Sequence, residues 1–253
     1  MTRRNLLLHL LLASITLRVA AAPADLLLVA PDDTTLAPLL EKLEEPRRET
    51  RAAWTFWSGQ LLGKSVVLTR TEGDPLNAVA ATTLAVRRYE PRLIVVFGLG
   101  RAHDPALRPH DVVVSESFVA FDGIVSPAAG IGDGSDALKW KKLPHPLMTH
   151  GERETPTSSF PASATALAVA KSLSPAPGRI VVGTLGSANQ INREADRIAW
   201  LRAQWGTTCE DGESAHVAGV GQLLGTPVIG FRVIDGSPIE AAAFTLKFVE
   251  AWK

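Results

Sequence analysis

Residues 26–30 and 93–97 read LLLVA and LIVVF without a polar interruption, and this feature constrains the fold of the chain most. Such runs are typical of strands buried on both faces, because a strand with one solvated face alternates apolar and polar residues. Longer segments with helical patterns lie after these runs, at 76–89, 193–205 and 239–252. Buried strands that alternate with helices predict an α/β domain in which helices cover a sheet.

No linker or low-complexity tract interrupts the chain after its first two dozen residues, so residues 25–253 are predicted to form one domain. Within it, segments 53–59 and 65–70 predict the two strands of a hairpin, and the charged segment 44–50 predicts a loop. Residues 126–161 contain many glycines and prolines and predict a long surface excursion, either a lid or a partner contact.

Residues 1–24 have the three parts of a secretory signal peptide. A positive start that contains Arg3 and Arg4 precedes a mostly apolar stretch, and small residues then permit cleavage after Ala22 or Ala24. The arginine pair is also compatible with export of the folded protein. The apolar stretch is short for a membrane span, so an N-terminal anchor is the weaker alternative. The segment predicts a periplasmic or secreted protein that is free of the membrane after cleavage.

The charge and cysteine content exclude several kinds of site. Lysine plus arginine equals aspartate plus glutamate at 26 each, so the chain has no overall field to attract nucleic acid. Its single cysteine, Cys209, excludes an intramolecular disulfide and any metal site with several cysteines. The six histidines show no metal-ligand spacing, and we therefore expect no metal and no cofactor.

The segment 208–236 brings together the acids most suited to chemistry. Its first half predicts a helix that begins near Glu213 and ends at Gly225, and its second half predicts a strand that ends at Asp235. Ligands of open α/β sheets bind outside the carboxyl ends of the strands, where both acids are expected. The alternative is structural, with Glu213 complementing the helix dipole and Asp235 forming a turn.

Four blocks of sequence, taken in order, resemble the nucleoside phosphorylase superfamily. They are residues 73–83, 91–115, 183–192 and 210–236, and together they cover most of residues 25–253. The resemblance is closest to exported members of the methylthioadenosine and S-adenosylhomocysteine nucleosidase branch. It implies a three-layer αβα fold of the phosphorylase/hydrolase type with a central mixed, twisted sheet. It also implies a homodimer whose ligand is a small-molecule nucleoside.

The resemblance assigns roles to particular residues. A glutamate at the fourth-block helix accepts hydrogen bonds from ribose hydroxyls, and Glu213 stands there, with Asp211 and Gly212 beside it. An aspartate after the next strand donates to the purine, and Asp235 is the candidate. An acid after the first strand activates water, and Asp32 and Asp33 are near that place, with Asp33 taken as the candidate. The base site comprises Ser187, Asn189, Gln190 and Ile191. The phosphate or water site comprises Gly98, Leu99, Gly100 and Arg101.

This chain departs from the family pattern at four of these places. The usual acid position is occupied by Gly236, so that Asp235 stands one residue early. Leu99 replaces a serine that binds phosphate or water, Ile191 replaces an aromatic residue near the base, and Gly212 replaces a methionine.

The leading hypothesis is an exported nucleosidase-like hydrolase that cleaves the N-glycosidic bond of a purine-type nucleoside. The alternatives are a phosphate-dependent nucleoside phosphorylase, for which Arg101 is a conceivable phosphate ligand, and a non-catalytic nucleoside-binding protein.

Overall fold

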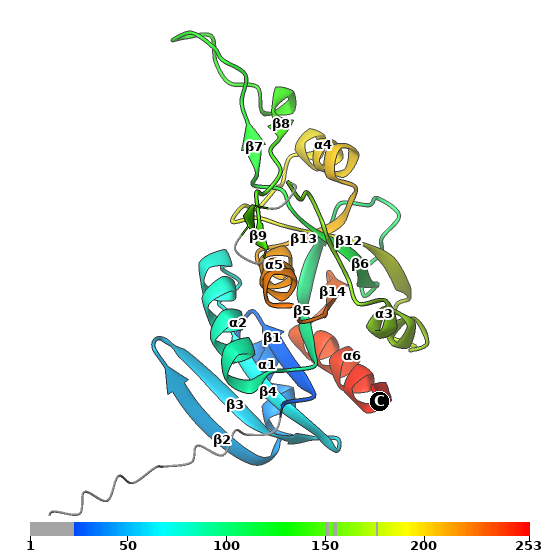
Figure 1. The fold of residues 1–253 in the computed structure, drawn as a ribbon. Helices are drawn as coiled ribbons and strands as arrows, with labels where there is room; N and C mark the ends of the chain where they lie inside the picture. Colours follow the sequence, from blue (N-terminus) through cyan, green and yellow to red (C-terminus); the bar gives the residue numbers. More distant parts are fainter. Residues whose placement is uncertain (1–22, 150–151, 154–155, 176) are drawn as a thin grey trace, which may run out of the picture.

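The computed structural model describes residues 23–149, 152–153, 156–175 and 177–253 (Figure 1). The predicted signal peptide lies almost entirely in residues 1–22, outside the described residues. In the described part of the chain, no helix is long and apolar enough to cross a membrane.

A mixed sheet of ten strands forms the centre of the domain. Strands β1 (Leu26–Ala30), β4 (Lys64–Arg70), β5 (Leu93–Ala102) and β14 (Val228–Ile234) run parallel, with β1 between β4 and β5 and with β14 on the other side of β5. The other strands of this sheet are β2 (Glu44–Arg51), β3 (Trp54–Leu61), β6 (Val112–Ala120), β11 (Phe160–Pro161), β12 (Ile180–Ser187) and β13 (Thr207–Asp211).

Part of this sheet closes on itself. β14 pairs with both β5 and β6, β12 pairs with both β6 and β13, and β13 returns to β5. The pairings therefore form a ring of five strands, from which β1, β4, β3 and β2 extend as an open sheet. Each of these five strands is paired on both sides within the ring, so none of them is an edge strand. This pairing holds the strand ends that carry the candidate site in fixed positions.

Side chains on neighbouring positions of β1 enter different cores, as expected for a strand buried on both faces. Leu26 and Leu28 join a core with α1 (Asp33–Leu40), α3 (Ala164–Lys171) and α6 (Pro238–Ala251). Leu27 and Val29 join a core with α2 (Pro75–Tyr89) and α5 (Ser214–Leu224). Figure 1 shows these two groups of helices on opposite sides of the sheet. The predicted three-layer α/β fold is confirmed.

One local prediction was wrong. Residues 44–50 form most of edge strand β2, which pairs with β3, and not a loop. β2 is almost wholly exposed, so it needs no apolar alternation, and its charges and Pro46 suit an edge that must not recruit another strand. Helix α1 is capped by Asp32, whose Oδ1 accepts a hydrogen bond from the Thr35 amide at 2.8 Å.

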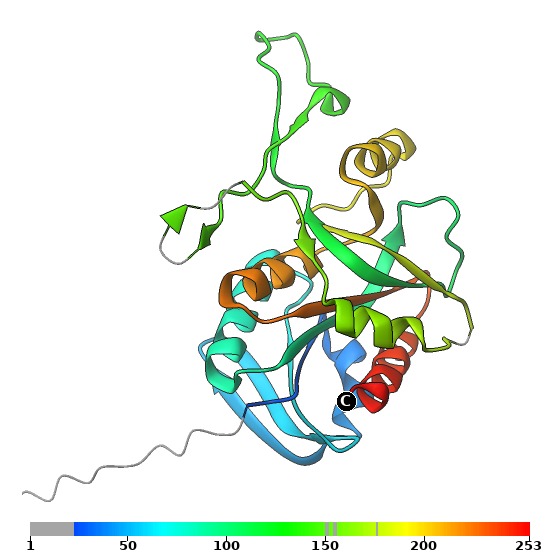
Figure 2. The same ribbon diagram turned by 45° about the vertical axis from the view of Figure 1, so that its right-hand side comes forward.

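Most of the described residues in the surface excursion predicted at 126–161 form an arm that projects from the domain (Figure 2), but its last two residues form β11 of the central sheet. Its short elements are β7 (Ile124–Val125), the 3₁₀ turn η1 (Ala137–Lys139), β8 (Lys141–Lys142), β9 (Met148–Thr149) and β10 (Glu152–Arg153). Trp140 of the arm packs toward α4 (Ala195–Trp205), where the Arg197 guanidinium lies 5.8 Å from its ring and 4.5 Å from that of Trp200. Stacking of a guanidinium on indole rings attaches the arm to α4.

Candidate active site

The candidate site is a cavity of about 380 Å³ at the carboxyl ends of β1, β4, β5 and β14. The turn after β13 closes one side of it. Its lining consists of Pro31, Asp32, Thr35, Gly73, Leu99, Gly100, Arg101, Glu210, Asp211, Gly212, Glu213, Arg232 and Asp235. The volume falls within the range of small-molecule sites, about 300–1,000 Å³.

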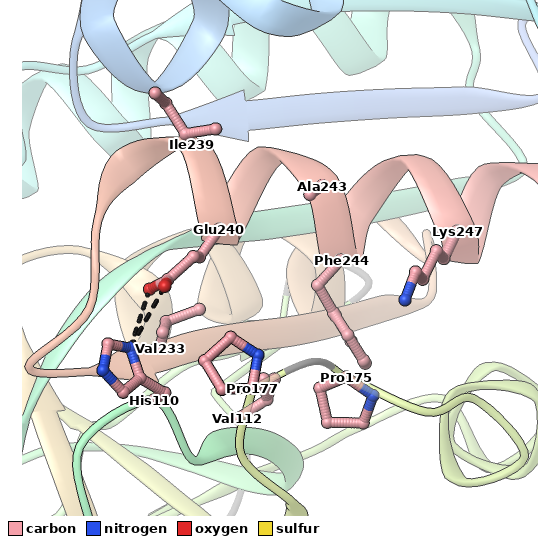
Figure 3. Close-up of a pocket in the computed structure, with 10 residues that line it drawn as sticks. All are labelled: His110, Val112, Pro175, Pro177, Val233, Ile239, Glu240, Ala243, Phe244 and Lys247. Carbon is pink, nitrogen blue, oxygen red and sulfur yellow. Dashed lines mark hydrogen bonds and ion pairs between the residues drawn. The ribbon is translucent and has the colours of Figure 1, made fainter.

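A second cavity lies between α6 and the start of β6 and is shown in Figure 3. His110, Glu240, Phe244 and Lys247 contribute to its wall. Its volume is only about 100 Å³, below the range of small-molecule sites. We assign ligand binding to the cavity at the strand ends because it contains buried acids and an arginine at the carboxyl edge of the sheet, although other cavities of the described structure are larger.

A buried ionic network forms the floor of the larger cavity. Arg232 is 1% exposed, and its Nε donates to Asp211 Oδ2 at 2.9 Å while its Nη2 donates to Glu213 Oε1 at 3.2 Å. The Ser214 hydroxyl accepts from the same Nη2 at 2.7 Å. The Thr71 hydroxyl donates to the other Glu213 oxygen. A buried charge is tolerated only when it is paired and hydrogen-bonded in this way.

Asp211 supports this floor and has little capacity left for a ligand. Its Oδ1 accepts from the amides of Glu213 and Ser214, each at 2.7 Å, and from the Ser187 hydroxyl at 2.9 Å. Burial acts to raise the pKa of Asp211, but Arg232 and these hydrogen bonds outweigh it and hold the pKa below its ordinary value. The lowered pKa favours the ionised form of Asp211 within the network.

Glu213 differs from Asp211 in the direction of its pKa shift and in the number of its protein donors. Burial raises its pKa above the ordinary value, although Arg232 and Thr71 act in the opposite direction. Each of its oxygens has one protein donor, whereas a carboxylate has about four acceptor positions. Glu213 lines the cavity and so retains acceptor positions for the hydroxyls of a ligand.

Close approach of Arg232 explains one glycine of the predicted phosphate or water site. A Cβ atom on Gly98 would lie 2.5 Å from Arg232 Nη1, closer than a side chain can approach. Gly98 therefore packs against the guanidinium and is not part of the cavity lining, whereas Leu99, Gly100 and Arg101 line the cavity. Among the described residues, none forms a hydrogen bond or an ion pair with the Arg101 guanidinium.

Glu210 forms a second buried polar group at the wall of the cavity. Asn192 donates to it through its side-chain amide at 2.6 Å and its backbone amide at 3.1 Å. His103 Nε2 lies 3.1 Å from Glu210 Oε2, and the other ring nitrogen lies 2.7 Å from the Thr207 hydroxyl. Burial raises the pKa of Glu210, but the contacts with His103 and Asn192 outweigh it, so the pKa is lowered.

The structure brings one group of predicted site residues together. Asp235, Glu213, Gly212, Asp211, Leu99, Gly100 and Arg101 all line the same cavity. Asp235 is exposed and has the left-handed backbone conformation, with φ of 45°. In the described part of the chain, no side chain or amide bonds to its carboxyl group.

The remaining predicted residues lie outside the cavity lining. Asp33 is exposed and pairs with Arg70. Ser187 is buried, and its hydroxyl is occupied by Asp211 and by the Ala215 amide, so the geometry does not favour its predicted contact with the base. The other three residues predicted to contact the base are exposed on the loop after β12; they are Asn189, Gln190 and Ile191.

Several cavity residues were not among the predicted set. Asp32 lines the cavity beside the place predicted for Asp33. Arg232 had a recognisable signal, because a single arginine within an apolar strand requires buried acidic partners. No local sequence pattern indicates the contacts of Glu210 with Asn192 and His103, because these residues meet only through the closed ring of strands. In the described part of the chain, no group of three or more His, Cys, Asp or Glu side chains is placed to hold a metal.

The chain is similar to known proteins along nearly all of the described domain. It is 26% identical over 209 residues to the 5'-methylthioadenosine/S-adenosylhomocysteine nucleosidase of Marinomonas sp. (strain MWYL1), covering 82% of this chain and 84% of that one. The corresponding protein of Bacillus licheniformis is 25% identical over 200 residues, covering 78% of this chain and 79% of that one. A nucleosidase structure from Colwellia psychrerythraea 34H, in complex with adenine, matches with a TM-score of 0.73. That match has 18% identity and covers 90% of this chain and 96% of the other.

The family model described as "Phosphorylase superfamily" matches residues 25–251. The match spans every strand of the central sheet and every residue of the cavity lining. The chain belongs to the phosphorylase superfamily.

Proposed function

We propose that this protein is a nucleosidase, a hydrolase that cleaves the N-glycosidic bond of a purine-type nucleoside. The observation that carries the proposal is the charge of the cavity. Arg232, one of the two guanidinium groups in the lining, is already paired with Asp211 and Glu213. Asp32, Glu210 and Asp235 supply further carboxyl groups. Negative charge stabilises an oxocarbenium-like transition state and disfavours a phosphate nucleophile.

The roles follow from the places of the acids. Glu213 accepts hydrogen bonds from ribose hydroxyls, because it lines the cavity and its carboxylate is fixed by Arg232 and Thr71 with acceptor positions left over. Asp235 delivers a proton to the leaving base from the turn after β14. Asp32 accepts the proton of the attacking water, a role that its place in the cavity supports better than that of Asp33. Water thus adds to the anomeric carbon as the bond to the base breaks.

The base preference is a separate part of the proposal. The relatives named above have 5'-methylthioadenosine and S-adenosylhomocysteine in their names, and these two nucleosides are the first substrates to test. The loop that carries Asn189, Gln190 and Ile191 lies after β12 and remains the predicted neighbour of the base. Leu99 supplies an apolar surface where the resemblance has a serine.

The phosphorylase alternative depends on Arg101. This guanidinium lines the cavity and is not engaged by the described residues, so it is available to a phosphate ion. The third alternative, nucleoside binding without turnover, is favoured by the displaced acid at Asp235 and by Leu99.

One experiment separates the three functions. The protein lacking residues 1–22 is incubated with methylthioadenosine, S-adenosylhomocysteine and adenosine, with and without phosphate, and free base is measured. A hydrolase releases base without phosphate. Strict phosphate dependence would establish a phosphorylase, and saturable binding without release of base would establish a binding protein.

We also propose that the protein is exported and forms a homodimer. The support for export is the signal-like sequence of residues 1–24. The support for a dimer is the exposed apolar surface at the start of α2, where Leu76 is 80% and Val79 is 42% exposed, close to the cavity residue Gly73. N-terminal sequencing of the native protein tests the first proposal, and a mass measurement by light scattering tests the second.

A further inference from the structure

The carboxyl group of Asp235 is directed by its backbone alone. Asp235 follows β14 in a left-handed conformation, and no described residue bonds to its side chain. The turn itself is held on its β14 side by His110, whose amide donates to the carbonyl of Ile234 at 2.7 Å. Whatever holds the two ends of this turn therefore decides where the Asp235 carboxyl points.

Glu240 of α6 holds the other end of the turn. Its Oε2 accepts a hydrogen bond from the amide of Ser237 at 2.9 Å, as part of the capping box that begins α6. His110 Nδ1 lies 3.1 Å from one oxygen of the same carboxylate and 3.2 Å from the other. Figure 3 shows the His110 ring and the Glu240 carboxylate pointing toward each other, joined by dashed lines, among the residues that line the small cavity. His110 thus contacts both ends of the turn, one through its backbone and one through Glu240.

The same carboxylate also crowds position 236, next to the acid. A Cβ atom on Gly236 would lie 2.3 Å from Glu240 Oε2 and 2.5 Å from Val233 Cγ1, so that a side chain there requires both groups to move. An aspartate at the position that the resemblance assigns to the acid is incompatible with Glu240 in its present place. The acid at 235 and the carboxylate of Glu240 therefore belong to one arrangement.

We propose that His110 and Glu240 are positioning residues that aim Asp235 at the nucleoside cavity. The inference rests on the proposed function, since it gives Asp235 a part in departure of the base. Neither residue is proposed to touch substrate, because both lie in the wall of the separate small cavity behind the turn. Loss of the pair leaves Asp235 present but wrongly directed.

The variants are chosen to separate positioning from folding. Glu240→Ala removes the acceptor for both His110 and Ser237, whereas Glu240→Gln keeps a side-chain oxygen for the cap. His110→Asn removes the ring, and asparagine tolerates the left-handed conformation found there, with φ of 70°. Lys247→Met is the matched control, because Lys247 lines the same cavity but donates to the Ser174 carbonyl, away from the turn.

Turnover is measured for each variant with Asp235 present and in an Asp235→Asn background. We expect Glu240→Ala and His110→Asn to lower kcat by about 10-fold with little change in KM, because misdirected groups lose rate rather than binding. Glu240→Gln and Lys247→Met should stay within about threefold of the parent enzyme. In the Asp235→Asn background, neither Glu240→Ala nor His110→Asn should lower kcat further. An equal loss in both backgrounds, or a loss expressed in KM, would overturn the inference.

Amide hydrogen exchange provides a readout that does not depend on catalysis. The amide of Ser237, which donates to Glu240, should exchange about 10-fold faster in Glu240→Ala than in the parent protein, and at the parent rate in Lys247→Met. Unchanged exchange in Glu240→Ala would refute the positioning role, even if the protein cleaved none of the nucleosides. Failure of the parent protein to release base, with accelerated exchange in Glu240→Ala, would instead overturn the proposed function alone.

Discussion

The two sides of the candidate cavity are built differently. On the floor, Asp211, Glu213 and Arg232 are buried and bonded to one another and to their neighbours. At the rim, Asp235 and Arg101 are exposed and are not engaged by any side chain in the described residues. The floor is fixed by the fold, whereas the rim depends on backbone geometry.

This difference separates binding from chemistry. A fixed carboxylate that faces ribose hydroxyls serves an enzyme and a binding protein equally well. The rim carries both the displaced acid, Asp235, and Leu99, where the resemblance has a serine. Substitutions on the floor should therefore affect stability and affinity, and substitutions at the rim should affect turnover.

Arg232→Met is the strongest test of the floor. The change leaves Asp211 and Glu213 buried without their positive partner, which should lower the free energy of unfolding by about 3–5 kcal/mol. Arg101→Met is the matched control at the rim, where we expect a change within about 0.5 kcal/mol. Urea unfolding monitored by circular dichroism measures both. Similar losses in the two variants would remove the distinction between floor and rim.

Asp235→Asn tests the rim. Asparagine keeps the shape of the side chain and tolerates the left-handed backbone, so the fold should be unaffected. Turnover should fall by roughly 10²–10⁴-fold, as for loss of a group that transfers a proton, with little change in nucleoside affinity. Steady-state release of base and calorimetric binding of adenine provide the two readouts. Full activity in this variant would show that Asp235 only forms a turn, which is the structural alternative given by the sequence.

Asp32→Asn and Asp33→Asn form a pair that tests which acid activates water. Asp32 lines the cavity and caps α1, and asparagine is an equally good cap, so the substitution should preserve stability. Turnover should fall by about 10²-fold in Asp32→Asn. Asp33 pairs with Arg70 at the surface, and its substitution should leave turnover unchanged. The reverse order of effects would restore Asp33 to the role that the resemblance gave it.

The layers of the fold could be predicted because burial on both faces is visible in the sequence. β1 and β5 contain no polar residue within their apolar runs, and their alternate side chains enter opposite cores. β2 could not be predicted in the same way, because an exposed edge strand carries no apolar signal. The charges of residues 44–50 suit a loop and an edge strand equally well.

The candidate site was predictable where it follows strand ends and unpredictable where it depends on closure. Glu213 and Asp235 were found because the order of helix and strand places them at one edge of the sheet. Glu210 meets Asn192 and His103 only because β13 joins β5 and β12 in the closed ring. The hydroxyl of Ser187 turns inward to Asp211 for the same reason, and no local pattern indicates that direction.

Glu213→Gln should have the smallest of these effects, and it tests the floor through its charge. Glutamine keeps the size of the side chain but is a weaker acceptor for ribose hydroxyls, so nucleoside affinity should fall by about 1–3 kcal/mol. Isothermal titration with a nucleoside measures the change. Unchanged affinity would show that the ribose is bound elsewhere.

The pH dependence of stability and of nucleoside affinity provides a second test of Glu213. As Glu213 ionises with rising pH, its contribution to stability should fall while nucleoside affinity rises. Burial raises the pKa of Glu213 in the folded protein above its ordinary value of 4.5. The stability that this group contributes is therefore fully present below the unfolded pKa and is lost as the pH rises through the raised folded pKa. Affinity should rise over the same interval, because the ionised carboxylate is the stronger acceptor.

The variant Glu213→Gln is the control, and both trends should disappear from this interval. The contribution of Asp211 to stability should remain, and it is lost only as the pH falls through the lowered pKa of Asp211. Parallel rather than opposite trends in the parent protein would mean that Glu213 is not the group that binds ribose.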